Sequence, residues 1–356
     1  MTTPPTVSPA WLIAATATVL EGAGLAPEPA RALADSLVDA DAHGVASHGV
    51  MLVPMYVERL RAGSVSTAAT AHVVRDDGGA AAVLDAGHAL GQLTAVQAMG
   101  LAVEKAKRLG VGAVAVRGAF HFGRALPFAQ LAAAQGCIGV AMANTRPLMP
   151  APGGAEPVVG NNPVAVAAPG DPGLGVDMAL SEAALGKIRI AAAEGRPIPE
   201  TWATDADGVP TEDPAAALEG MLLPAGGAKG FGLALVVDVL AGVLSGGAFG
   251  TAVAPLYQDT AVPNDCAHFF LAIDVEHFVG REAFAAGMAQ LAAGVLGSRP
   301  RPGADPVVLP GQRGAALAAR AAAEGIVMDP STLEGLQRAA AAVGVHLPRT
   351  DMEAIR

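Results

Sequence analysis

Hydrophobic and polar positions divide the chain into three stretches with different periodicities. From Ser8 to about Ser64, apolar side chains recur every three or four residues, which predicts helices. From His72 onward, short β-rich runs alternate with helical segments and predict an α/β body. After about Arg299, a proline-rich segment precedes two alanine-rich helical patterns. We therefore expect a helical cap over residues 1–71, an α/β body over 72–299, and a loop with helices over 300–356 that packs back on the cap.

The apolar content is high but does not indicate a membrane protein. Hydrophobic residues make up 52% of the 356 positions, and alanine supplies much of that share. The run from Gly232 to Leu256 is long enough to suggest a membrane span, yet Asp238 and several glycines interrupt it, so we expect a buried helix and no membrane association. The N-terminal segment has no basic residue ahead of its short apolar run, which disfavours a secretory signal and predicts a cytoplasmic location.

Charge and cysteine content exclude several classes of partner and site. The net charge of −11 disfavours nucleic-acid binding, and we interpret the short basic segment from Lys105 to Arg108 as the solvated flank of a helix. Cys137 and Cys266 are too few and too isolated for a disulfide framework or a four-cysteine zinc site, so both are expected in the core. Small molecules are the expected partners.

Two histidines lie close together in the stretch DAHGVASHGV. On a helix, the spacing of His43 and His48 would place them about 140° apart, and neither HExxH nor CxxC occurs, so we expect no metal site. His48 by itself has two interpretations. It is either an ordinary hydrogen-bonded histidine near a helix end or a group that transfers protons near neutral pH.

A third histidine lies where a strand is expected to lead into a helix. His121, Phe122 and Gly123 follow the predicted strand AVAVRGA and precede a helix with Pro127 in its first turn. Such a junction is either an ordinary connection or a place where backbone N–H groups hold phosphate. The only relaxed match to the dinucleotide fingerprint, GVGAVA, follows a helix and enters a strand, so we reject a standard Rossmann site.

Asp177 and Lys229 also have surroundings that suit chemistry. Asp177 ends the apolar run GLGV ahead of a predicted helix that contains Lys187, where it either caps that helix or orients a catalytic group. Lys229 is expected in a glycine-rich loop that lets a ligand approach the backbone closely. It is either a phosphate ligand or a solvated lysine.

Six stretches along the chain are informative as an ordered series. They are SHGVMLVPMYVERLRAG, HFGRA, NTRPLMPAPGGAEPVVGNNPVA, DMALSEAALGKI, GRPIPETWATDADGVPTEDPAAALEGMLLPAGGAKGFGLAL and AHFFLAID. Together they resemble the malate/L-lactate dehydrogenase family of the non-Rossmann type, which also contains ureidoglycolate and sulfolactate dehydrogenases, diketogulonate reductase and piperideine-2-carboxylate (ketimine) reductases. The resemblance covers nearly the whole chain in the right order, and no single motif decides it.

This resemblance implies a fold, a cofactor and an assembly. It implies a non-Rossmann NAD(P)-binding α/β body with a mixed, largely antiparallel sheet, together with a helical domain built from both chain ends. It further implies NADPH or NADH as the cofactor, and a homodimer whose active site lies near the subunit interface. The implied reaction is hydride transfer to a C=O or C=N bond of a small-molecule ketone or imine.

The same resemblance assigns roles to individual residues. It implies that His48 is the acid that delivers a proton while hydride arrives at the carbon, with Ser47 and Asp177 as a relay that orients and recharges it. The residues implied to line the dinucleotide are His121, Phe122, Gly123, Arg124, Ala125, Met178, Ala179, Leu180, Lys229, Gly230 and Arg313. Arg313 favours NADPH, since a guanidinium binds a 2′-phosphate well.

Two positions depart from the family pattern in ways that concern the substrate. Leu52 follows His48 by four residues, where many relatives have an arginine that binds the substrate carboxylate, and Asn161 replaces the threonine of GTNP. An unpaired buried charge costs several kcal/mol, so ordinary malate or lactate chemistry is not expected. The residues expected around the substrate are Leu52, Asn161, His121 and Met149.

Three explanations for the missing arginine stay open. The first is a substrate that lacks the carboxylate. The second is that Arg124 or Arg146 supplies the charge from another position, which gives a malate- or lactate-like 2-hydroxy acid dehydrogenase with a relocated anchor. The third is a protein that binds nucleotide without catalysis, although retention of Ser47, His48 and Asp177 argues against it.

Overall fold

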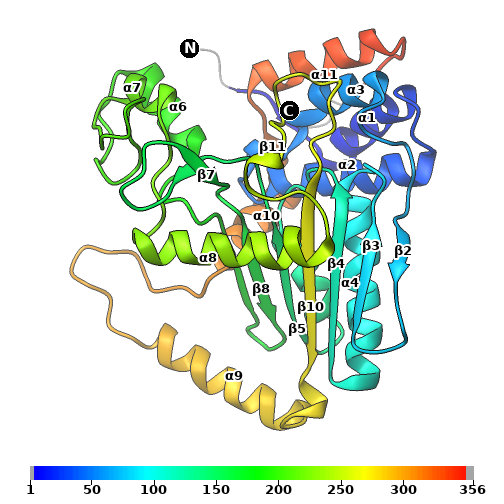
Figure 1. The fold of residues 1–356 in the computed structure, drawn as a ribbon, viewed down its shortest axis with the longest axis vertical. Coiled ribbons are helices and arrows are strands. Elements are labelled where there is room, and N and C mark those ends of the chain that lie inside the picture. The colour runs from blue at the N-terminus through cyan, green and yellow to red at the C-terminus, as the bar shows by residue number, and fades with distance from the viewer. Residues whose placement is uncertain (1–3, 350–356) are drawn as a thin grey trace.

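A seven-stranded sheet runs through the middle of the molecule (Figure 1). The computed structural model describes residues 4–349. The strands, in spatial order, are β2 (His72–Arg75), β3 (Ala81–Asp85), β4 (Val111–Ala119), β10 (Cys266–Asp274), β5 (Cys137–Ala143), β8 (Val164–Ala168) and β9 (Leu174–Met178). Within this sheet β3 and β4 pair in parallel and the other five neighbouring pairs are antiparallel. The predicted mixed, largely antiparallel sheet is therefore confirmed.

Different helices cover the two faces of the sheet. The helices α4 (Gly91–Leu109) and α5 (Leu126–Ala133) pack on one face, whereas α8 (Ala228–Asp238) and the π-helical segment η3 (Val239–Val243) cross the other (Figure 1). Small side chains let α4 approach closely, since a Cβ at Gly112 would lie 1.9 Å from the carbonyl oxygen of Ala102. Cys137 and Cys266 are buried, and both belong to this core as predicted.

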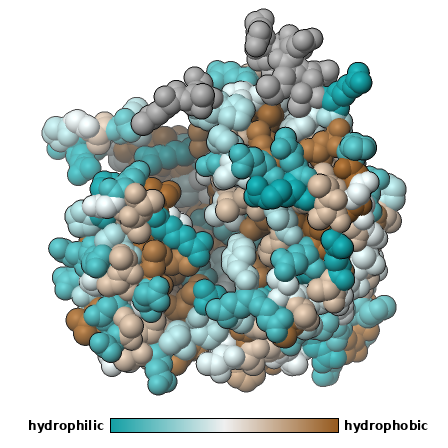
Figure 2. Space-filling model, turned by 90° about the horizontal axis from the view of Figure 1, so that it is seen from above, coloured by the Kyte–Doolittle hydropathy of each residue, from teal (hydrophilic) through white to brown (hydrophobic). Residues whose placement is uncertain are grey.

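Helices from both chain ends pack together at one end of the molecule (Figure 1), which is the end that faces the viewer in Figure 2. They are α1 (Pro9–Gly22), α2 (Pro27–Ala42), α3 (Val53–Ala62), α10 (Gln312–Glu324) and α11 (Pro330–Ala342). Ser8 and Asp329 begin α1 and α11, and their side chains accept the N–H groups of Trp11 and Ser331. The short strands β1 (Thr6–Val7) and β11 (Ile326–Val327) pair antiparallel and join the two ends. The helical region built from both ends is thus confirmed.

A smaller lobe projects from the body, and its apolar core continues into α8 and packs against the sheet at Met142 and Val164. Its elements are β6 (Met149–Pro150), β7 (Pro157–Val159), α6 (Leu185–Glu194) and α7 (Pro214–Glu219). The sequence pattern does not separate this lobe, because its strands are only two and three residues long. Other elements are η4 (Gly250–Ala252), η5 (Val275–His277) and α9 (Arg281–Leu296).

The segment from Gly232 to Leu256 is not the buried helix that its apolar run predicts. The α-helix passes after Asp238 into the π-helical η3, and the outer face of this helical segment is apolar yet open to solvent, with Leu233 53%, Val239 54% and Leu244 57% exposed. Length and hydropathy alone cannot show whether an apolar helix is covered on both sides. Among residues 4–349, no helix combines the length and the apolar character needed to cross a membrane.

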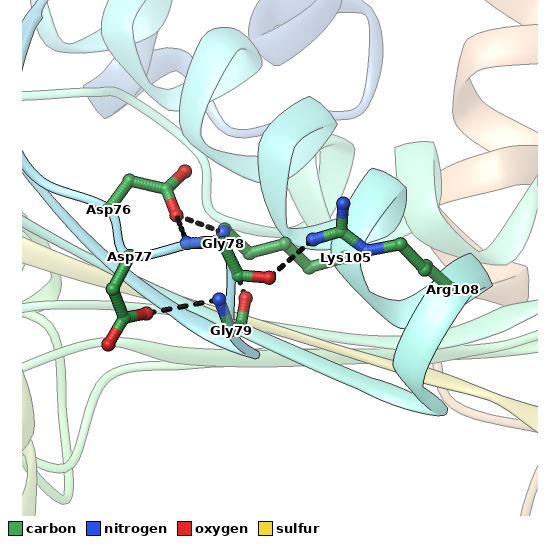
Figure 3. A network of polar contacts seen from close by, with 6 residues as sticks. All are labelled: Asp76, Asp77, Gly78, Gly79, Lys105 and Arg108. Carbon is green, nitrogen blue, oxygen red and sulfur yellow. Dashed lines mark hydrogen bonds and ion pairs between the residues drawn. The ribbon is translucent and has the colours of Figure 1, made fainter.

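The basic segment near the end of α4 is also less solvated than predicted. Lys105 is buried, and its Nζ binds Asp76 at 2.7 Å and the carbonyl oxygen of Gly79 at 3.0 Å (Figure 3). Arg108 donates to the carbonyl oxygen of Gly78 in the same turn. These bonds fasten the turn between β2 and β3 to α4, so Lys105 is a structural residue of the body and the solvated-flank interpretation is wrong for it.

Candidate active site

The stretch that contains Ser47 and His48 connects α2 to α3 through two short 3₁₀ helices. These are η1 (Ala46–His48) and η2 (Val50–Leu52), separated by Gly49. The Oγ of Ser47 lies 3.0 Å from Nδ1 of His48. A Cβ at Gly49 would lie 2.1 Å from a carboxylate oxygen of Asp41, so glycine is required for the turn to pack against that side chain.

Asp41 holds this turn and was not singled out from the sequence. Its Oδ2 accepts the N–H of Val50 at 2.8 Å, which fixes the start of η2 next to His48. Burial raises the pKa of Asp41 to about 6. The only signal in the sequence was its place in DAHGVASHG, since nothing in the pattern shows which backbone N–H an aspartate will reach.

Asp41 should make folding stability depend on pH. The folded protein holds this proton more tightly than the unfolded chain, in which the pKa is near 3.8, so the stabilisation is complete below about pH 4 and is lost as the pH rises through about 6. Asp41→Asn cannot ionise and keeps an acceptor for Val50. We expect denaturant unfolding to show the variant more stable than wild type at pH 8, by up to about 3 kcal/mol, and equal near pH 4.

The control for this prediction is Asp35→Asn in the same helix, at a side chain that is 48% exposed and pairs with Arg31 on the surface. It should change stability little at either pH. Equal stability of wild type and Asp41→Asn at pH 8 would show that ionisation of the buried Asp41 carboxyl does not lower the free energy of unfolding.

His48 and His121 lie against each other although they are far apart in the sequence. Their rings stack with centroids 5.5 Å apart and an interplanar angle of 25°. Burial, followed by the charge of Arg124, lowers the pKa of His48 below 6.5. Burial, with His48 and His268 nearby, lowers the pKa of His121 to about 3. Both rings are therefore mainly neutral at pH 7, and His48 is the one that can take up a proton under mild conditions.

Arg124 brings a fixed positive charge to the two histidines and to Asp177. It lies in the connection between β4 and α5, its side chain is 8% exposed, and its Nη1 pairs with Asp39 at 2.6 Å. Nδ1 of His43 bonds the backbone oxygen of the same Asp39 at 2.8 Å. The charge of Arg124 also opposes part of the rise that burial causes in the pKa of Asp177. The sequence did not indicate the Asp39 pair, which links the helical cap to the sheet at this site.

Asp177 caps a helix, but not the helix predicted. It lies on β9, and its Oδ2 accepts the N–H of Leu126 at 3.1 Å, at the start of α5. The helix α6 that contains Lys187 begins only at Leu185, so capping of α6 is excluded. Desolvation raises the pKa of Asp177 although the residue is exposed to solvent on β9, and the α5 N–H groups oppose that shift. Across the described part of the chain, no hydrogen bond joins Asp177 to His48; Arg124 is the group that acts on both.

The residues predicted to line a dinucleotide are partly open and partly buried. The loop from His121 to Ala125 lies at the junction of β4 and α5 as predicted, and Gly123 adopts a φ of +76° that favours glycine. The side chain of Phe122, however, is buried and stacks on His268 with centroids 4.5 Å apart. From Phe122 only the backbone is therefore free to meet a ligand.

The other predicted cofactor residues come from three elements. At the end of β9, Met178 is 48% exposed, Ala179 is half-buried and Leu180 is buried. Lys229 is exposed in the first turn of α8, so its placement in a loop is corrected. A Cβ at Gly230 would lie 2.2 Å from the oxygen of Ala225, so this glycine serves the packing of the turn. Arg313 is exposed in the first turn of α10.

The residues predicted around the substrate are not gathered in one open pocket. Leu52 is 1% exposed and packs in the core of the helical cap, and Met149 is 0% exposed in the core of the smaller lobe. Asn161 is half-buried, and its Oδ1 accepts the hydroxyl of Thr145 at 2.9 Å. Arg146 is half-buried, and burial, followed by the charge of Arg189, lowers its pKa. Direct contact of Leu52, Met149, Asn161 and His121 with a substrate stays a prediction, as does the alternative in which Arg146 binds its carboxylate.

Known proteins share both the sequence and the fold. A family model described as malate/L-lactate dehydrogenase matches residues 7–337. The ureidoglycolate dehydrogenase (NAD(+)) of Escherichia coli is 38% identical over 306 residues, which is 85% of this chain and 87% of that protein. The structure of sulfolactate dehydrogenase from Methanocaldococcus jannaschii superposes with a TM-score of 0.90 at 35% identity, covering 96% of this chain and 98% of the other. The Δ1-piperideine-2-carboxylate reductase of Pseudomonas syringae pvar. tomato gives 0.81 at 33% identity, covering 94% and 100%.

Proposed function

Since the chain belongs to the malate/L-lactate dehydrogenase family, we propose that it reduces a C=O or C=N bond of a small molecule in a pocket that differs from those of many relatives. The predicted resemblance is confirmed, and the protein is an oxidoreductase that uses NAD or NADP. The observation that supports the proposal best is the stacked pair of His48 and His121, with Ser47 bonded to His48. The imidazole of His48 can gain and lose a proton, whereas the imidazole of His121 stays neutral.

We assign proton delivery to His48. When hydride reaches the carbonyl or imine carbon, negative charge develops on the oxygen or nitrogen, and a positioned acid must neutralise it. The bond from Ser47 keeps the His48 ring in one orientation, and neutral His121 presents a polar edge without adding a second positive charge. Asp177 is assigned a supporting role through the start of α5 and the field of Arg124.

The chain offers groups that fit a dinucleotide. When bound, the nicotinamide supplies the hydride. The turn at Gly226 and Gly227, where an added Cβ meets nothing within 4 Å, leads into the N-terminus of α8 and leaves room for an anion beside exposed Lys229. Met178 offers an exposed apolar face, and exposed Arg313 is available for a 2′-phosphate. We assign these groups to the cofactor and propose NADPH over NADH because of Arg313.

The position of the missing arginine supports a substrate without the usual carboxylate. Leu52 packs among apolar side chains of the cap, so no charge is available at this point of the turn. A second candidate is a 2-hydroxy acid substrate that is held by Arg124. Its Nη1 pairs with Asp39, whereas its other two nitrogens have no hydrogen bond within residues 4–349. The charge that acts on Arg146 is that of Arg189, and within residues 4–349 no hydrogen bond or ion pair joins Arg146 to the histidine pair.

The direct test is a titration of NADPH, then NADH, into the protein with nicotinamide fluorescence as the signal. Each mixture is then given a panel of 2-oxo acids, cyclic imino acids, and carboxylate-free imines and ketones. Oxidation of the cofactor only by imines or carboxylate-free compounds supports the altered pocket. Oxidation by 2-oxo acids supports the Arg124 anchor. Failure to bind either nucleotide would contradict the assigned function.

We also propose that the protein forms a homodimer through the outer face of α8 and η3. This face carries a continuous apolar stripe, which is more than a lone domain usually exposes. Its members are Leu233, Val236, Val239, Val243 and Leu244. Val239→Asp should lower the mass seen by light scattering from that of two chains toward that of one. The control Val73→Asp, at an edge-strand position that is 57% exposed, should leave the mass unchanged.

A further inference from the structure

A buried chain of hydrogen bonds ends on His121. Nε2 of Gln92 donates to the hydroxyl oxygen of Tyr56 at 2.9 Å, and that hydroxyl lies 2.8 Å from Nδ1 of His121. Tyr56 is 0% exposed and Gln92 is 2% exposed. The three residues come from α3, α4 and the loop after β4, so the helical cap and the body meet at this chain.

The direction of this chain fixes the proton on His121. Because Gln92 donates to the oxygen of Tyr56, the Tyr56 hydroxyl is free to donate its own proton to Nδ1 of His121. A neutral imidazole has one N–H, so the proton must then be on Nε2. We propose that Tyr56 and Gln92 are positioning residues that hold His121 in the Nε2–H tautomer. This proposal deepens the function given above and rests on it for its catalytic meaning.

The packing around the chain keeps its members in place. A Cβ at Gly91 would lie 2.0 Å from the carbonyl oxygen of Phe120, so α4 begins in direct contact with the backbone before His121. The ring of Phe120 lies edge-on to Tyr56 with centroids 5.4 Å apart, and the guanidinium of Arg59 lies 5.6 Å from that ring. Tyr56 therefore has little freedom to turn its hydroxyl away from His121.

The tautomer determines what His121 can do beside His48. With Nδ1 engaged by Tyr56, the free edge of the ring carries an N–H donor, which can bond the substrate oxygen or nitrogen where negative charge develops. With the opposite tautomer, that edge would be an acceptor and would repel the same atom. His121 thus acts as a neutral donor, while the proton itself comes from His48.

The test is a nitrogen NMR spectrum of the cofactor-free protein with ¹⁵N-labelled histidine. The signals of His121 are assigned by their loss in His121→Asn. We expect the Nε2 shift of a protonated nitrogen and the Nδ1 shift of an unprotonated one. In Tyr56→Phe, both shifts should move toward averaged values because no donor fixes Nδ1. The matched control is Tyr257→Phe, at the only other tyrosine, which is 60% exposed and should leave both shifts unchanged.

A second variant tests the part assigned to Gln92. In Gln92→Glu, the introduced carboxylate can only accept once it ionises, so the Tyr56 hydroxyl should turn toward it and the proton of His121 should move to Nδ1 as the pH is raised. A wild-type spectrum with Nδ1 protonated would overturn the proposal, as would unchanged shifts in Tyr56→Phe. If the Gln92→Glu spectrum keeps the wild-type pattern up to pH 10, the assignment of Gln92 is wrong.

Kinetics separate this proposal from the proposed function. Tyr56→Phe should lower kcat about tenfold or more while the Kd for NADPH stays within twofold, since a misdirected donor affects the transition state. A correct tautomer in wild type without any turnover would leave the hydrogen-bond chain in place and contradict the proposed function. Turnover in a protein whose His121 has the opposite tautomer would contradict only the positioning role proposed for Tyr56 and Gln92.

Discussion

Replacing His48 with alanine should lower kcat by about 10²–10⁴-fold while leaving nicotinamide binding intact. His48 is the site histidine assigned to proton transfer, and its Nδ1 is already held by Ser47 at 3.0 Å. Its ring stacks on His121 without reaching into the apolar core of the cap, so truncation should not unfold the protein. Stopped-flow reduction of the substrate and fluorescence titration of NADPH measure the two quantities.

The pH dependence of kcat/KM provides a further test of the role of His48. Burial and Arg124 hold the pKa of His48 below 6.5, so His48 loses its proton at a pH under 6.5. As the pH is raised, kcat/KM for reduction should therefore start to decrease before pH 6.5 is reached, and kcat/KM for oxidation should increase over the same range. Both limbs should vanish in His48→Ala. His72→Ala, at an exposed position on β2, serves as the control and should keep the wild-type profile. Wild-type turnover in His48→Ala would remove the assignment.

The second large effect is expected for the negative charge of Asp177. Asp177→Asn keeps an acceptor for the N–H of Leu126, so α5 should stay capped, while the charge beside Arg124 is lost. With that charge gone, the field of Arg124 on His48 is less balanced, and we expect kcat to fall about tenfold to 100-fold. Thermal unfolding should change by only a few degrees. Asp177→Ala removes the cap as well and should unfold at a lower temperature than Asp177→Asn.

A matched control is available at another helix start. Asp213 begins α7, and its Oδ1 accepts the N–H of Ala215, so Asp213→Asn makes the same chemical change away from the histidine pair. It should leave kcat unchanged. If Asp177→Asn keeps full activity while Asp177→Ala loses it, the role of Asp177 is to cap α5, and its charge plays no part in turnover.

The sequence predicted features that depend on local pattern or on an ordered series of motifs. The strands around His121 and the two C-terminal helices follow from periodicity, and the family follows from six stretches in order. The assignment of His48 and His121 to one active site came from resemblance alone, because the two are 73 positions apart in the chain. Nothing in the local pattern of either stretch brings them together.

The sequence could not predict which distant residues contact a given side chain, and three positions show this. Asp177 was expected to cap the start of α6, yet its carboxylate accepts the N–H of Leu126 at the start of α5. Lys105 looked solvated because its neighbours are basic, yet a turn from the far end of β2 covers it. Leu233 looked buried because its segment is apolar. For Asp177 and Lys105 the deciding contact joins residues far apart in sequence, and for Leu233 the deciding fact is that no distant segment of the described chain covers it.

The shared core of the two chain ends also bears on when the protein becomes active during its synthesis. The turn with Ser47 and His48 lies between α2 and α3, and α3 packs against α11, which ends at Ala342. A nascent chain that lacks α11 has nothing to cover that side of α3 and therefore exposes apolar surface. The turn with Ser47 and His48 gains its full support only after the chain through Ala342 has been made, about 290 residues after the turn itself.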